Sequence, residues 1–186
     1  MDTASPIDMQ SITMAQVLDL YAAGRRDFSH LDFHEAWMPG LELPGIDLAQ
    51  ANLVSANLDG AVLVGANLGG CNLWRASLEM ADLQAANLTR SILIRAQLSG
   101  ANLNQANLSS SDLRLASLTG AGLCRSDLRN ANLSYADLRN ADLADADLRG
   151  ANLTGANLRG VSLATARLGG ASLDRAWMDP SPELSY

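Results

Sequence analysis

The chain has 186 residues, the length of one domain, and a formal net charge of −7. All 13 basic residues are arginines, and residues 1–50 carry most of the net negative charge, so the rest of the chain is close to neutral. This distribution excludes the basic stripe of a nucleic-acid-binding protein, and we expect no direct contact with nucleic acid. No apolar run approaches a membrane span of about 18 residues and the start does not resemble a signal peptide, which predicts a cytoplasmic protein without a membrane partner.

The first predicted element is a short amphipathic helix within residues 11–25, preceded by a flexible N-terminus at 1–10. Thr13 and Gln16 are spaced as a capping box, and Gly24 is placed to end the helix. Four apolar residues recur at helical spacing: Met14, Val17, Leu18 and Tyr21. Because the polar face lacks basic residues, we expect this helix to cap an open end of the core that follows rather than to bind a membrane.

Leucine occupies every fifth position from Leu43 to Leu173, 27 times in succession, and a small residue, usually alanine, stands two positions before it. Leucines five residues apart would not line one face of an α-helix, and on a flat strand they would alternate between the two faces. The chain must therefore turn after each short extended piece, so that every leucine points inward. Four such turns close a square coil of about twenty residues, and we expect residues that far apart to stack on one face.

Glycines and prolines agree with this turning path. Of the 15 glycines, 11 stand two residues after a central large residue, at the second central position of the predicted turn. A type II turn needs a positive φ there, which glycine adopts at least cost. All five prolines lie outside Gly45–Asp179, where backbone N–H groups are needed for pairing between coils.

The five-residue unit resembles the pentapeptide-repeat family, as in Ala-Asn-Leu-Asp-Gly at 56–60 and Ala-Asp-Leu-Arg-Asn at 136–140. The resemblance covers residues 26–178 and implies an all-β fold, a right-handed quadrilateral β-helix of about eight coils. The segment Tyr-Ala-Ala-Gly-Arg-Arg-Asp-Phe at 21–28 is similar to cyanobacterial members. The chain is less similar to the gyrase-inhibiting, quinolone-resistance members, which dimerise through a C-terminal helical extension, because the tail at 179–186 contains two prolines.

One group of outward positions is unusually apolar. Val54, Trp74 and Ile94 occupy the turn position after leucine in successive coils, and Ile92 lies beside them. The candidate protein-binding face, named here the Trp74 stripe, comprises Val54, Trp74, Arg75, Ile92, Ile94, Arg95, Arg114, Leu115 and Tyr135. Aromatic and arginine side chains are enriched at interface hot spots, so the stripe is either a contact surface or a set of tolerated surface hydrophobes.

No catalytic, cofactor-binding or metal-binding residues are predicted, and we expect the chain not to be an enzyme. The cluster with metal-ligand side chains has the spacing of no zinc motif and is interpreted as a corner of the first coil: His30, Asp32, His34 and Glu35. No glycine loop suits a phosphate, and no nucleophile is paired with a base. Cys71 is predicted inside the coil and Cys124 outside it, so no disulfide is expected.

Three functions remain open. The first is a non-enzymatic scaffold with a regulatory role that binds an unidentified protein through a solenoid face. The second is a DNA mimic that modulates DNA gyrase or another topoisomerase, which requires a continuous acidic surface. Here Arg129, Arg139 and Arg149 alternate with aspartates, which predicts mutually compensating ion pairs. The third is a structural rod that assembles end to end, or forms a homodimer through one solenoid end.

Overall fold

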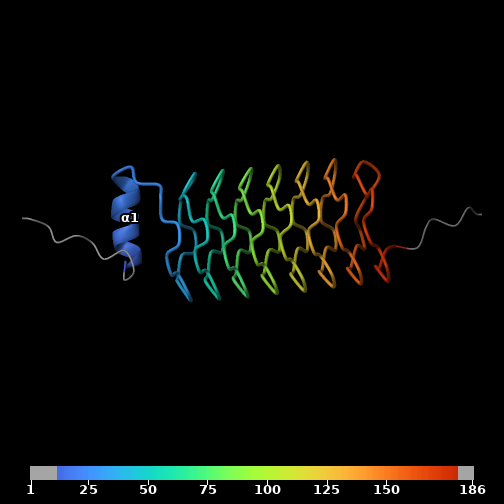
Figure 1. The fold of residues 1–186 in the computed structure, drawn as a ribbon, viewed down its shortest axis with the longest axis horizontal. Coiled ribbons are helices and arrows are strands. Elements are labelled where there is room, and N and C mark those ends of the chain that lie inside the picture. The colour runs from blue at the N-terminus through green and yellow to red at the C-terminus, as the bar shows by residue number, and fades with distance from the viewer. Residues whose placement is uncertain (1–11, 180–186) are drawn as a thin grey trace, which may run out of the picture.

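The computed structural model describes residues 12–179, which form one helix followed by a rod of stacked coils (Figure 1). Helix α1 spans Met14–Ala22 and begins with the predicted capping box. The Gln16 N–H donates to Thr13 Oγ1 at 3.3 Å, and the Thr13 N–H donates to Gln16 Oε1 at 2.9 Å. The segment 1–10 and residues 180–186, which include most of the predicted tail, lie outside the described residues.

Helix α1 ends at Ala22, earlier than the predicted boundary at residue 25, because the chain then turns back on itself. Gly24 has a φ of +99°, and its N–H donates to the carbonyl of Tyr21, while the Arg25 N–H donates to the carbonyl of Leu20. These two bonds form the Schellman motif that glycine at this position favours. Residues 25 and 26 therefore lead into the first coil.

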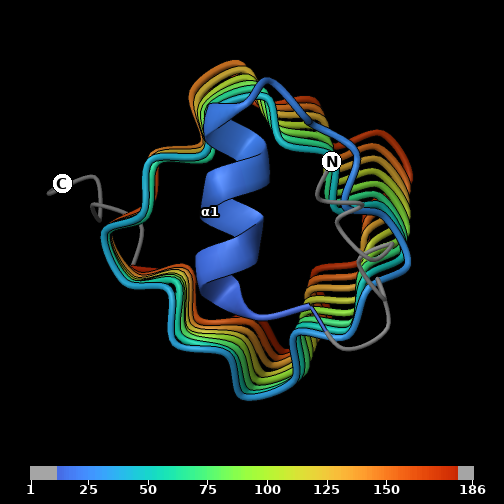
Figure 2. The same cartoon turned by 90° about the vertical axis from the view of Figure 1, so that its left-hand side faces the viewer.

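Helix α1 lies across the opening of the first coil (Figure 2). Val17 belongs to the same buried cluster as Phe28 and Phe33 from the first repeats. The Tyr21 hydroxyl donates to the Pro44 carbonyl at 2.7 Å, which ties the helix to the coil. Within residues 12–179 no helix is long and apolar enough to cross a membrane.

Neighbouring coils are joined by parallel single-residue bridges between residues twenty apart, from Asp27↔Asp47 to Asn157↔Trp177. No longer strand forms in the described chain, because a turn follows each short extended piece. In a typical repeat the Leu103 N–H donates to the Gly122 carbonyl of the next coil at 2.7 Å. The turn closes where the Ala106 N–H donates to the Leu103 carbonyl at 3.1 Å.

The core is a column of leucines with a small residue beside each. The leucines from Leu53 to Leu113 are fully buried, as are nearly all the alanines between them. Serine can replace alanine because its hydroxyl finds an acceptor in the core: Ser91 Oγ donates to the Leu88 carbonyl at 2.7 Å, and Ser111 does the same to Leu108 at 2.6 Å. The rod thus needs no side chain larger than leucine in its central coils.

Where asparagine or aspartate stands before a core leucine, its side chain is half-buried rather than directed into the core, and at Asp142 it is exposed. In most repeats its carboxamide or carboxylate oxygen accepts the N–H two residues later; Asp137 Oδ1, for example, accepts the Arg139 N–H at 3.2 Å. Several also bond along the rod, such as Asn87 Nδ2 to Asn67 Oδ1 at 2.8 Å. These side chains therefore stabilise both the turns and the stacking of coils.

The turns have the predicted positive φ at their second central residue, with one interruption. From His30 to Arg175, Thr165 is the one residue at this position in the described chain without a positive φ. Threonine is β-branched and strongly disfavours that conformation. Around it the ladder bonds between Ser162 and Ala141 and between Leu143 and Ser162 are absent, and the corner opens near the red end of the rod (Figure 1).

The C-terminal end of the described rod is less covered than the N-terminal end. Three core-position leucines of the last coil, Leu163, Leu168 and Leu173, are only partly buried. Within residues 12–179 no helix lies across them as α1 lies across the first coil. The two ends of the rod are therefore chemically different.

A candidate protein-binding corner

The residues of the Trp74 stripe come together along one corner of the rod. Backbone hydrogen bonds connect their turns in order: the Ser55 N–H donates to the Trp74 carbonyl at 2.9 Å and the Arg75 N–H to the Ile94 carbonyl at 3.1 Å. Ile92 lies in the same ladder, bridged to Asn72. The stripe residues at the turn positions of this corner are, in chain order, Val54, Trp74, Arg75, Ile94, Arg95, Arg114, Leu115 and Tyr135, and the two remaining turn positions in these coils are Ser55 and Ser134.

The stripe exposes a substantial amount of apolar side chain. Trp74 is 38% exposed, Ile92 39%, Leu115 48% and Tyr135 59%, and Val54 and Ile94 are half-buried. Single exposed hydrophobes are common on protein surfaces, but here they follow one another over five successive coils. The stripe is therefore a continuous apolar line on an otherwise mostly polar rod.

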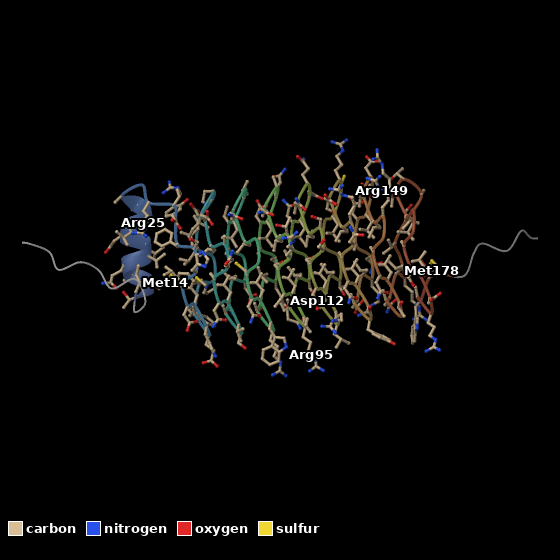
Figure 3. The ribbon with its side chains drawn as sticks, in the orientation of Figure 1. Met14, Arg25, Arg95, Asp112, Arg149 and Met178 are labelled. Atoms are coloured by element: carbon tan, nitrogen blue, oxygen red, sulfur yellow. The ribbon has the colours of Figure 1, made fainter. Side chains whose placement is uncertain are left out.

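The three arginines of the stripe differ in their partners. Arg114 donates to both carboxylate oxygens of Asp112, with Nε to Oδ1 at 2.9 Å and Nη2 to Oδ2 at 2.8 Å, and this raises its pKa. Among residues 12–179, neither Arg75 nor Arg95 forms an ion pair with an acidic side chain. Arg75 instead lies over Trp74, with its guanidinium carbon 4.8 Å from the ring centroid, and Arg95 points away from the rod (Figure 3). The stripe thus carries two uncompensated positive charges.

A glycine in the following coil leaves room for the Tyr135 ring. Its φ of +59° directs the side chain along the rod, and its ring lies over Gly155. A methyl group on Gly155 would be 2.6 Å from Tyr135 Cδ1. Met80 has the same relation to Gly100 on another corner. A large side chain at this turn position therefore fits where the next coil offers a glycine.

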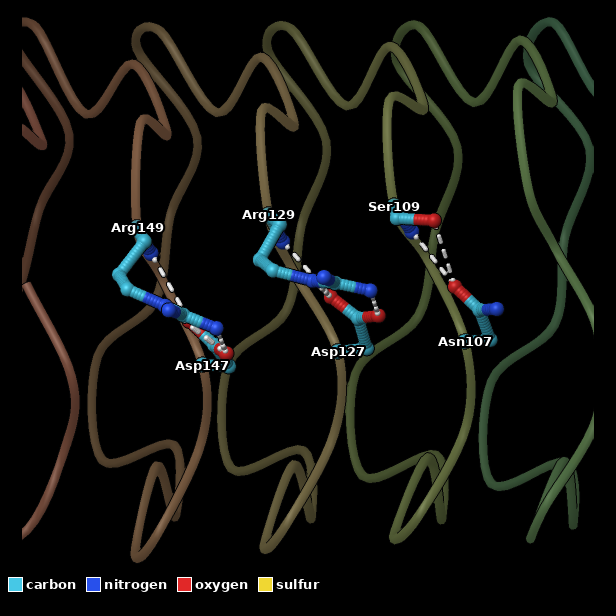
Figure 4. A network of polar contacts seen from close by, with 6 residues as sticks. All are labelled: Asn107, Ser109, Asp127, Arg129, Asp147 and Arg149. Carbon is cyan, nitrogen blue, oxygen red and sulfur yellow. Dashed lines mark hydrogen bonds and ion pairs between the residues drawn. The ribbon is translucent and has the colours of Figure 1, made fainter.

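Arginines in the C-terminal half of the rod are mostly neutralised by aspartates, as the sequence predicted. Asp127–Arg129 and Asp147–Arg149 are stacked ion pairs, each with a 2.6 Å contact, in line with Asn107 and Ser109 (Figure 4). The hydrogen bond from Arg149 lowers the pKa of Asp147 to about 2. Arg159 stands two residues after Asn157, which carries no charge, and its guanidinium carbon instead lies 5.1 Å from the centroid of the Trp177 ring.

The remaining candidates form no site among the described residues. In residues 12–179 no three His, Cys, Asp or Glu side chains gather as metal ligands, and no pocket is present. His34 pairs with Glu35 at 3.6 Å on the first-coil corner. Cys71 is buried, which raises its pKa to about 12, and Cys124 is partly exposed; both are free.

Sequence reasoning did not single out two strongly exposed residues. Trp37 is 74% exposed and Met80 is 73% exposed. Trp37 stands before a central residue, where most repeats have a polar side chain, and this substitution was the available signal. Neither residue occupies a turn position of the Trp74 corner, so neither extends the stripe.

A family model described as pentapeptide repeats matches in eight copies spanning residues 27–178. Among solved structures, the chain is similar to HetL, a pentapeptide repeat protein involved in heterocyst differentiation regulation from the cyanobacterium Nostoc sp. strain PCC 7120. The two are 31% identical over 89% of this chain and 94% of HetL, with a TM-score of 0.35.

Two further solved structures show similar repeats. The pentapeptide repeat protein alr5209 from Nostoc PCC 7120 is 39% identical over 56% of this chain and 80% of its own, with a TM-score of 0.30. Full-length QnrB1, a plasmid-mediated fluoroquinolone resistance protein, is 17% identical over 80% of this chain and 93% of its own, with a TM-score of 0.36. Comparison with curated proteins gives no match.

Proposed function

This chain belongs to the pentapeptide-repeat family, whose members fold as right-handed quadrilateral β-helices, and we propose that it is a non-enzymatic scaffold that binds a protein through the Trp74 stripe. The observation that carries this proposal is the line of exposed and half-buried apolar side chains on one corner, beside two arginines that pair with no carboxylate among residues 12–179. We further propose a regulatory role in the cytoplasm, exerted by binding rather than by chemistry.

The backbone of the stripe supports this proposal because it is held in place before any partner arrives. Each turn is closed by its own hydrogen bond and is bonded to the next coil, as between Arg95 N–H and the Arg114 carbonyl at 3.0 Å. Trp74 is further restrained by the guanidinium of Arg75. A preorganised surface loses little conformational entropy on binding, so aromatic anchors on it contribute more to affinity.

DNA mimicry is the less supported alternative. Four aspartates of the rod, Asp112, Asp127, Asp137 and Asp147, each form an ion pair with an arginine two residues later. Carboxylates neutralised in this way are poor substitutes for DNA phosphates. In a DNA supercoiling assay with gyrase we expect neither inhibition nor protection from a quinolone, and either effect would favour the mimic.

Unlimited end-to-end assembly is also poorly supported. We propose that α1 caps the first of about eight coils, because it lies across that opening and contributes Val17 to the core. A chain capped at one end can associate only through the other, where Leu168 is partly exposed. Such association would stop at a homodimer, so growth beyond a dimer in concentration-dependent light scattering would contradict the cap.

Differential affinity capture tests the scaffold proposal. The double variant Trp74→Ala, Ile94→Ala should fold normally, because neither side chain points into the core, and should lose a protein that the wild type retains from a lysate of the source cells. Met80→Ala is the matched control, since it removes an exposed apolar side chain from another corner. Identical retention by all three proteins would exclude the stripe as the binding site.

A further inference from the structure

We propose that the partner presents an acidic amphipathic α-helix that lies along the Trp74 stripe, parallel to the rod. This inference rests on the proposed function and identifies the chemistry of the partner at the same site. It follows from the length and spacing of the stripe and from its unpaired charges.

The length of the stripe suits a short helix. Coils of this kind are about 4.8 Å apart, so the five coils from Val54 to Tyr135 span about 19 Å. A helix rises 1.5 Å per residue, and about 13 residues cover that distance. A partner segment of three to four helical turns is therefore long enough to contact every coil of the stripe.

The spacing of the stripe also favours a helix over an extended segment. Side chains on one face of a helix recur about every 5.4 Å, near the separation of about 4.8 Å between coils. On an extended strand they recur only about every 6.8 Å, so they fall out of step with the coils sooner. Apolar residues three or four apart in the partner would thus meet Trp74, Ile94 and Leu115 in turn.

The charges select an acidic partner. Arg75 and Arg95 stand at the same position of successive coils, and neither is paired with a carboxylate among residues 12–179. Two acidic residues three or four apart on a helix can each reach one of them. The charge of Arg114 is already compensated by Asp112. The end of the helix that carries the two acids therefore lies at the coils of Trp74 and Ile94, and its more apolar end lies at Leu115 and Tyr135.

A second copy of this chain fits the stripe less well. Within the stripe the neighbouring acid Asp112 is paired with Arg114, whereas Glu35, beside His34, and Asp174 lie beyond its two ends on this corner. Two stripes placed together would bring Arg75 and Arg95 against apolar or basic side chains without a free carboxylate. Self-association through the stripe therefore lacks the charge complementarity that an acidic helix supplies.

Peptide selection tests the partner chemistry directly. A displayed library of random 14-residue peptides is selected on the full-length protein, and the enriched peptides are synthesised with a fluorescent label for anisotropy titrations. We expect enriched sequences with apolar residues three or four apart and at least two acids. Their affinity should fall at least tenfold on the variant Arg75→Glu, Arg95→Glu, and peptides with those acids changed to lysine should regain affinity for that variant.

A matched variant controls for general electrostatics. Arg90 has the same turn position and a positive φ of 56° on another corner, so Arg90→Glu changes a comparable charge away from the stripe. Glutamate is compatible with this backbone, since Glu35 adopts a φ of 55°. Peptide affinity should be unchanged by Arg90→Glu, and an equal loss on this variant would contradict the proposed charge pairing.

The remaining outcomes separate this inference from the proposed function. Enriched peptides that lack acids, alternate apolar and polar residues, or bind the arginine variant as tightly as wild type would overturn the acidic helix while leaving the stripe as the site. Peptides that bind Trp74→Ala, Ile94→Ala as tightly as wild type would overturn both. Failure to enrich any peptide would also contradict an acidic helical partner.

Discussion

Replacing Thr165 by glycine should close the corner of the ladder that is open at this residue. Glycine adopts the positive φ that this turn position requires, so the bonds from Ser162 N–H to the Ala141 carbonyl and from Leu143 N–H to the Ser162 carbonyl can form. The present bond from Asp145 N–H to Thr165 Oγ1, 2.9 Å long, would be exchanged for the usual bond to the Ala164 carbonyl.

The expected change in the free energy of unfolding follows from the hydrogen bonds that form and the conformational entropy that glycine loses. Two recovered backbone hydrogen bonds stabilise the fold by about 2 kcal/mol together. Glycine loses more conformational freedom on folding, which costs about 0.5–1 kcal/mol. The expected net gain in the free energy of unfolding is therefore about 1 kcal/mol, or a rise in Tm of about 2–4 °C for a chain of this size.

Equilibrium unfolding in denaturant, followed by far-UV circular dichroism, measures the gain, and hydrogen exchange at the Leu143 amide shows whether the bond has formed. Thr89→Gly is the control, because Thr89 occupies the first turn position without a positive φ, and glycine there should destabilise the fold by about 0.5–1 kcal/mol. An unchanged stability and an unprotected Leu143 amide in Thr165→Gly would show that Thr165 does not hold this corner open. Val161 stands at the inward position that is usually alanine. If the variant Val161→Ala restored the missing hydrogen bonds and Thr165→Gly did not, the size of the valine side chain would be the cause of the open corner.

Three further predictions test the core, the surface pairs and the cysteines. Leu103→Ala, at a fully buried central position, should lower the free energy of unfolding by about 2–5 kcal/mol in the same denaturant assay; a loss below about 1 kcal/mol would contradict the inward register. The folded-state pKa of Asp147 is depressed from 3.8 to about 2, so its contribution to stability is present above pH 3.8 and is lost as the pH falls toward 2. Arg149→Ala should flatten that part of a stability-against-pH curve, and an unaltered slope would argue against the pair. Iodoacetamide should modify Cys124 well before Cys71 in the native protein, because Cys71 is buried with a pKa of about 12; mass spectrometry showing equal rates would contradict its burial.

The repeat architecture could be predicted from the sequence because each repeat obeys one local rule. A leucine at every fifth position defines which side chains point inward, and residues twenty apart then stack, as Asn52, Asn72 and Ile92 do. In a solenoid each coil contacts only its neighbours, so local pattern and global fold coincide. The grouping of Trp74 with Ile94 and Leu115 on one corner followed from that register alone.

The pairing of the stripe's arginines needed the structure, although a signal was present. In Asp-Leu-Arg the arginine occupies the first turn position and reaches back to the aspartate, as Arg114 does to Asp112. Arg75 and Arg95 occupy the second turn position, where the positive φ directs the side chain elsewhere. An arginine at the second turn position is paired only where an adjacent coil places a carboxylate beside it, as Asp145 does for Arg125 at 3.7 Å, so its compensation depends on the neighbouring coil as well as on turn geometry.

The open corner at Thr165 was not anticipated, because the leucine and the preceding small-residue position continue through this repeat with only Val161 as a departure. The ladder is interrupted here because a β-branched residue, Thr165, stands at a turn position that requires a positive φ. The end of α1 at Ala22, by contrast, agrees with the role predicted for Gly24, because the N–H groups of Gly24 and Arg25 donate to the carbonyls of Tyr21 and Leu20.

Site-specific photocrosslinking would show whether a protein partner contacts the Trp74 stripe. A photoreactive phenylalanine derivative is placed at Leu115 on the stripe or at Met80 on another corner, and each protein is irradiated in a lysate of the source cells. We expect a discrete crosslinked protein from position 115 that is absent from position 80 and is lost when Trp74→Ala is added. Crosslinking to the same protein from position 80 but not from position 115 would contradict this contact.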